Sequence, residues 1–129
     1  MSTNNTWGWK YEDIPQVVNI CRESGLAVLG GKTGFFLPDG ACDLYWKRAH
    51  PRLKTTHETW PQYVERSGSD FLRLIKELHE QTDFVNEGTH SFHLLKEKKD
   101  AGVNILDYLC FAVEVMPESR YFQFYSNLD

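Results

Sequence analysis

Two histidines have the spacing of a metal site. His90 and His93 stand three positions apart, and on one helix this spacing would direct both imidazoles to the same face, where Glu87 or His79 could add a ligand. Zinc sites, however, need three or four ligands in a fixed geometry, and the chain has neither a paired-cysteine motif nor an HExxH motif. We therefore expect no metal site and no bound cofactor.

The three cysteines are candidate nucleophiles. Cys21, Cys42 and Cys110 each lie within an apolar run, where burial raises the pKa of a thiol and makes it unreactive. The GxSxG motif of serine hydrolases is also missing, so we expect that the protein is not an enzyme and assign no catalytic residue. The alternative that stays open is a small hydrolase or transferase in which a histidine meets a cysteine or a carboxylate in space. Its histidine would come from this set: His57, His79, His90 and His93.

Two carboxylates, Asp39 and Asp43, flank a turn motif and are four residues apart. They could form a general acid/base pair, but Asp39 has a role within the turn and Asp43 alternates to the outside of a strand. Exposed side chains of this kind suit a binding surface better than catalysis.

The stretch that positions these carboxylates is LAVLGGKTGFFLPDGACDLYW, residues 26–46. Its Pro38-Asp39-Gly40 sequence predicts a tight hairpin turn. We expect two short strands before the turn, separated by a turn or bulge at Gly30 and Gly31, and a third strand over 41–49. A phosphate-binding loop would need a helix after the glycines, and a strand follows instead.

Alternation in this third strand divides its side chains between two faces. The period of two directs Cys42, Leu44 and Trp46 inward, and it directs Asp43, Tyr45 and Lys47 outward.

Helical spacing and end signals predict three helices. Pro15 in a first turn and Gly25 as a stop delimit a helix over 14–24. A second helix begins at Thr59-Trp60-Pro61 and is kinked or divided by the SGS sequence at 67–69. A third covers 91–100, a buried strand covers 108–116, and the segment RYFQFYS is expected to be an edge strand or a docked tail.

These elements predict one α+β domain over residues 1–129. Its antiparallel sheet combines the strands within 26–49 with the strand at 108–116, and two or three helices pack on one face. A chain of this length buries enough surface to form a core without disulfides.

Composition narrows the location and the partners. The N-terminus lacks a basic segment followed by an apolar one, no run approaches the roughly 18 apolar residues of a membrane helix, and the cysteines are odd in number. We therefore expect a cytoplasmic protein that does not bind membranes. Charge is uneven: residues 46–76 carry seven basic and three acidic groups, and residues 77–129 carry four basic and ten acidic groups. This balance disfavours nucleic acid and could face a basic partner such as a nuclease, although an acidic surface that only keeps the protein soluble is an alternative.

Four stretches in this order resemble a family of small bacterial immunity proteins of polymorphic toxin systems. They are GLAVLGG at 25–31, LPDGACDLYW at 37–46, ETWPQYVERS at 58–67 and ILDYLCF at 105–111. The resemblance implies a protein that binds and neutralises a cognate toxin, and it implies no catalysis. In that role a rigid face with acidic groups and aromatic anchors would occlude the toxin.

Expected exposure and charge select the contact surface for such a partner. The residues are Asp39, Asp43, Tyr45, Glu80, Asp83 and Glu87. A domain that senses a small molecule in a pocket formed by Trp46, Trp60 and Phe71 is a further alternative. Head-to-tail self-association of the basic and acidic segments would give a homo-oligomer.

Overall fold

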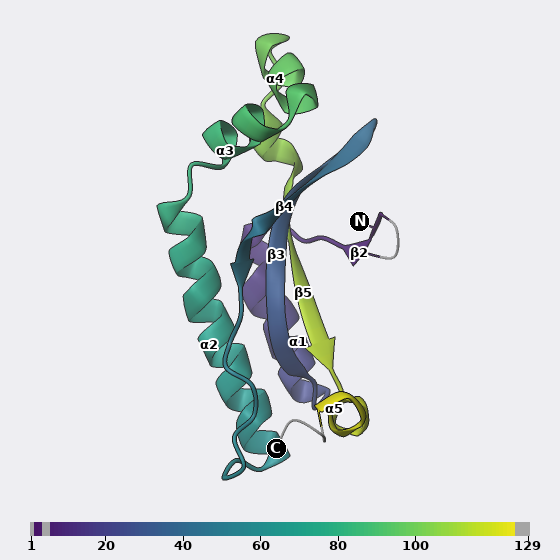
Figure 1. Cartoon of the computed structure of the whole chain (residues 1–129), viewed down its shortest axis with the longest axis vertical. Coiled ribbons are helices and arrows are strands. Elements are labelled where there is room, and N and C mark those ends of the chain that lie inside the picture. Colours follow the sequence, from purple (N-terminus) through teal and green to yellow (C-terminus); the bar gives the residue numbers. More distant parts are fainter. Residues whose placement is uncertain (1, 4–5, 126–129) are drawn as a thin grey trace.

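The computed structural model describes residues 2–3 and 6–125 and has the expected α+β architecture. Figure 1 shows a three-stranded antiparallel sheet with long helices beside it. In the sheet order, the strands are β4 (Gly40–Ala49), β3 (Ala27–Leu37) and β5 (Leu109–Met116). A short antiparallel ribbon precedes them, formed by β1 (Ser2–Thr3) and β2 (Thr6–Trp7). After the ribbon, the backbone of Trp9 exchanges two hydrogen bonds with Phe111 at the outer edge of β5.

Helices α1 and α2 lie along one face of this sheet, as the sequence predicts. Gly68 of α2 faces Val18 and Arg22 of α1, and Phe71 of α2 lies against Gly31 of β3. The helices are α1 (Ile14–Glu23), α2 (Trp60–Gln81), α3 (Phe84–Ser91), α4 (His93–Asp100) and α5 (Glu118–Tyr125). Single 3-10 turns, η1 (Tyr11–Asp13) and η2 (Ile105–Tyr108), precede α1 and β5.

The paired glycines do not form a turn. The two short strands expected at 26–31 and 33–38 are one continuous strand, β3, whose register shifts between Val28 and Gly30 against β5 and between Lys32 and Thr33 against β4. A Cβ on Gly31 would stand 2.4 Å from the Ala112 carbonyl oxygen. The glycines therefore serve close packing, and the bulge that was expected as an alternative to a turn is present.

The hairpin turn is confirmed. Leu37 pairs with Gly40, so Pro38 and Asp39 alone connect β3 to β4. Gly40 does not use a positive φ, since among the described glycines only Gly25 and Gly102 do.

The helix ends follow local chemistry. Gly25, at φ 70°, ends α1, and the Leu26 N–H bonds the Cys21 carbonyl as in a Schellman cap. Thr59 and Gln62 form a reciprocal capping box at the start of α2. Asp13, by contrast, makes no capping bond through its side chain to any described residue.

The predicted division of α2 is wrong, because the helix runs unbroken through Ser67 and Gly68. The Ser67 hydroxyl is buried and accepts a 3.0 Å bond from the Val28 N–H while donating to the Val64 carbonyl at 3.2 Å. Gly68 allows α1 to approach, since an added Cβ would stand 2.7 Å from Nε of Arg22. These small residues fit a helix–helix and helix–sheet contact, not a break.

Two helices were not predicted. The segment that precedes the expected third helix forms α3, capped by the Asp83 carboxylate, which accepts from the Asn86 N–H at 3.1 Å. The expected edge strand or docked tail at the C-terminus is α5 as far as Tyr125, and Ser126 lies outside the described residues. In α5, Tyr121 is buried against Trp60 and Tyr63.

Candidate functional site

A large bulge in β4 creates the candidate site. Along β3, Thr33 pairs with Leu44, but the next residue, Lys32, pairs with Arg48. The three residues Tyr45–Lys47 are therefore unmatched, and the buried Thr33 hydroxyl donates to the Lys47 carbonyl at 3.3 Å. Bulges re-aim side chains and concentrate near functional sites.

The bulge projects two aromatic rings from the sheet. Tyr45 is 67% exposed and Trp46 is 40% exposed, and their rings meet edge to face with centroids 5.0 Å apart. The Trp46 ring also stacks near Phe92, which joins α3 to α4, at a centroid distance of 6.3 Å and an interplanar angle of 17°. We call Tyr45, Trp46 and Phe92 the aromatic patch.

Glu87 on α3 fixes the orientation of the patch. The indole N–H of Trp46 donates to Glu87 Oε1 at 3.1 Å, and the Lys47 ammonium lies 3.4 Å from the same oxygen. The bond from Trp46, followed by that from Lys47, lowers the pKa of Glu87. The carboxylate is therefore ionised at neutral pH and ties the bulge to α3.

Exposed ion pairs border the patch on the sheet side. Lys32 contacts Asp43 at 3.2 Å, and Arg48 contacts Glu114 at 3.0 Å. Together with the Lys47–Glu87 pair they form a charged rim around an apolar centre.

The structure brings three of the six expected contact residues to this region: Asp43, Tyr45 and Glu87. Asp39 lies at the hairpin turn, about 20 Å along the strand from the bulge, where Lys98 contacts it at 2.8 Å and lowers its pKa. A hollow of about 180 Å³ beside this pair is smaller than the usual pocket for a drug-sized ligand.

The other two expected residues have different positions and roles. Glu80 is exposed near the end of α2, and Asp83 serves as the N-cap of α3, one turn before Glu87. The expected surface is thus not uniformly acidic, because Asp39, Asp43 and Glu87 each contact a lysine from another part of the chain.

Sequence reasoning missed two members of the patch. Trp46 was predicted to face inward, which is wrong, because the bulge breaks the period of two after Leu44. Phe92 was expected inside a helix, whereas it separates α3 from α4. The adjacent pair Tyr45-Trp46 was the available signal, since two neighbouring large rings on a regular strand would point to opposite faces.

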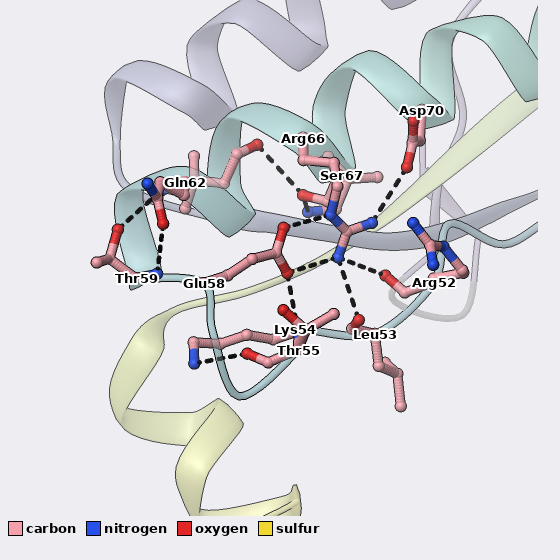
Figure 2. Close-up of polar contacts among 12 residues, drawn as sticks. Arg52, Leu53, Lys54, Thr55, Glu58, Thr59, Gln62, Arg66, Ser67 and Asp70 are labelled. Carbon is pink, nitrogen blue, oxygen red and sulfur yellow. Dashed lines mark hydrogen bonds and ion pairs between the residues drawn. The ribbon is translucent and has the colours of Figure 1, made fainter.

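A second polar cluster surrounds Arg66 (Figure 2). Its guanidinium donates to both carboxylate oxygens of Glu58, to Asp70 at 3.1 Å, and to the carbonyls of Arg52 and Leu53 at 3.2 and 3.1 Å. The bond from Arg66 is the largest cause that lowers the pKa of Glu58, which falls to about 2. Because every group of this cluster is engaged within the chain, it acts as a clamp between α2 and the connector that follows β4.

The histidines of the enzyme alternative do not converge. His57 precedes α2 and His79 lies in its last turn, so the length of the helix, about 30 Å, separates them. His79 stacks on Tyr11 with centroids 3.8 Å apart. His90 and His93 stand on different helices, because α3 ends before Phe92, and His93 pairs with Glu97 at 2.8 Å. The common helix face assumed for a metal site is therefore not formed.

The remaining alternatives are tested by the positions of cysteines and aromatics. Burial raises the pKa of all three thiols: Cys21, Cys42 and Cys110. The three residues expected to line a sensor pocket lie apart: Trp46 is on the bulge, Phe71 is in the main core, and Trp60 is in a second cluster, where it bonds the Gly25 carbonyl.

Within the described ranges, no three side chains among His, Cys, Asp and Glu are grouped so that they could hold a metal ion. None of the described helices combines the length and the apolar character needed to cross a membrane. Comparisons with models of protein families, with curated proteins and with solved structures find no match to this chain. The functional argument therefore rests on the residues of the chain.

Proposed function

We propose that this chain binds one partner protein through the aromatic patch, and that the partner is a cognate bacterial toxin which the chain neutralises by occlusion. The observation that carries the proposal is the exposure of Tyr45 and Trp46 on a bulge that is held in place by Glu87 and Thr33. Neither catalysis nor a cofactor is part of the proposal.

The arrangement has the features of a protein interface. Tyrosine and tryptophan supply large contact areas and dominate the binding energy of interfaces. The indole N–H of Trp46 already has its acceptor in Glu87, so a partner can cover this ring without leaving the N–H unpaired. The charged rim would remain at the border of the contact, where ion pairs keep some access to water and contribute to specificity and to the rate of association.

Pre-organisation supports tight binding. Trp46 is held by a ring stack and a hydrogen bond, and Gly88 of α3 packs against Phe35 in the core. Side chains that are ordered before binding lose less entropy when the complex forms.

The assignment of the partner as a toxin rests on the family resemblance. The excess of acidic groups in residues 77–129 supports a basic partner, since complementary fields speed and orient an encounter.

The proposal is tested by capture from a lysate of the producing organism, with this chain as bait. The wild type is compared with the double variant Y45A/W46A and with F124A, which removes a 60% exposed ring of α5 at another site. We expect the wild type and F124A to retain one stoichiometric partner whose toxic activity stops on binding, and we expect the double variant to lose it. A failure to retain any partner, or equal loss by F124A, would contradict the proposal.

A further inference from the structure

We infer that the aromatic patch receives an arginine side chain of the partner, whose guanidinium packs on the exposed ring of Tyr45 and pairs with Glu87 Oε2. This inference rests on the proposed function, because it names the chemistry that the partner must present at the same surface.

The first argument is an acceptor with unused capacity. The bonds to Glu87 from Trp46 and Lys47 both end on Oε1, and no bond from a described residue to Oε2 is present. The side chain of Glu87 is 32% exposed, and its lowered pKa keeps it ionised. An ionised carboxylate oxygen at the edge of an aromatic patch prefers a cationic donor to a neutral one.

The second argument is the exposed ring surface beside that oxygen. Tyr45 stands edge to face with Trp46 and is 67% exposed, so its ring is open to a partner. Aromatic faces attract cations, and arginine is the cation found most often in such contacts because its planar, weakly hydrated guanidinium can stack on a ring.

The surrounding charges define the approach. Lys47 lies at Oε1, and His90 also acts on Glu87, so a second cation must reach the carboxylate from the side of Oε2. Over a longer range, residues 77–129 carry ten acidic and four basic groups, which favours a cationic partner.

The experiment follows the indole N–H signal of Trp46 by NMR during titration with a short, capped peptide that contains one arginine. The W46F variant assigns this signal among those of the four tryptophans. Matched peptides carry citrulline, a neutral isostere of arginine, or lysine. The variant E87Q keeps an acceptor for Trp46 but removes the charge, and E80Q removes an exposed carboxylate elsewhere.

We expect a saturable shift with the arginine peptide, binding that is about fivefold weaker for the citrulline and lysine peptides, and a similar loss in E87Q but not in E80Q. Equal binding of the citrulline or lysine peptide, or wild-type affinity in E87Q, would overturn the inference.

The two proposals can fail separately. If lysate capture depends on Tyr45 and Trp46 but the arginine peptide does not bind, the arginine inference is wrong and the proposed function stands. If the peptide binds with the expected dependence on Glu87 but no partner is captured, the guanidinium site stands and the proposed function is wrong.

Discussion

The substitution E58Q tests the clamp around Arg66. The pKa of Glu58 falls from its ordinary value near 4.5 to about 2, and at 1.36 kcal/mol per unit this difference corresponds to roughly 3 kcal/mol of stability. The side chain is 16% exposed, and screening by solvent reduces the effect. We therefore expect E58Q to lower the free energy of unfolding by about 2 kcal/mol at neutral pH.

The pH dependence has a defined sign. A carboxylate whose pKa is lowered by folding stabilises the folded state above its unfolded pKa, and this stabilisation is lost as the pH falls through the folded value. The difference in stability between wild type and E58Q should therefore be complete above about pH 5 and should shrink between about pH 4.5 and pH 2.

Urea unfolding at several pH values measures this difference. With a slope of about 1–3 kcal/mol per molar urea, the expected loss lowers the midpoint of the wild type by about 1 M. The matched control is E65Q, on the same helix, whose carboxylate is 71% exposed and 3.7 Å from Arg22, so its effect should stay within about 0.5 kcal/mol. A destabilisation by E58Q that persists unchanged to about pH 2.5, or one no larger than that of E65Q, would refute the argument.

Three further predictions concern packing and association. The substitution G31A places a Cβ 2.4 Å from the Ala112 carbonyl oxygen and should cost about 2–3 kcal/mol in chemical denaturation, whereas G40A, whose nearest contact is 3.6 Å away, should stay within about 0.5 kcal/mol; similar values for both would contradict the role given to the paired glycines. The substitution S67A leaves the buried Val28 N–H without its acceptor and should cost about 1–3 kcal/mol, which the same assay would disprove by showing no loss. Because many charges are paired within the chain, its mass by light scattering should be that of a monomer at low and high salt, and a dimer that dissociates in salt would support head-to-tail association instead.

Local signals were sufficient where neighbouring residues determine the structure. The Gly25 stop, the Pro38-Asp39-Gly40 turn and the capping box of Thr59 and Gln62 act within a few residues of the chain, and each is present. The strand at 108–116 is also confirmed as β5, because an apolar run of this length suits a buried strand.

The signals failed where distant contacts decide. Gly31 and Gly68 read locally as breaks, but each occupies a place where another element approaches too closely for a side chain. The sequence does not show which residues approach, so a turn and a divided helix were predicted in place of a long strand and a long helix.

The candidate site was found only in part for the same reason. Exposure and charge selected Tyr45 and Glu87, but the contact between Trp46 and Glu87 depends on a bulge in β4 and on α3, and neither follows from a regular alternation. Phe92 joins the site because α3 ends there, which brings its ring near that of Trp46.

The central claim is that Tyr45 and Trp46 form the energetic centre of a protein interface. It is tested most directly by the affinity of the captured partner for wild type, Y45A/W46A and F124A, measured by calorimetry. We predict that the double variant binds about 100-fold more weakly or not at all, that F124A binds like the wild type, and that both variants remain folded. Wild-type affinity in a folded Y45A/W46A variant would contradict the account.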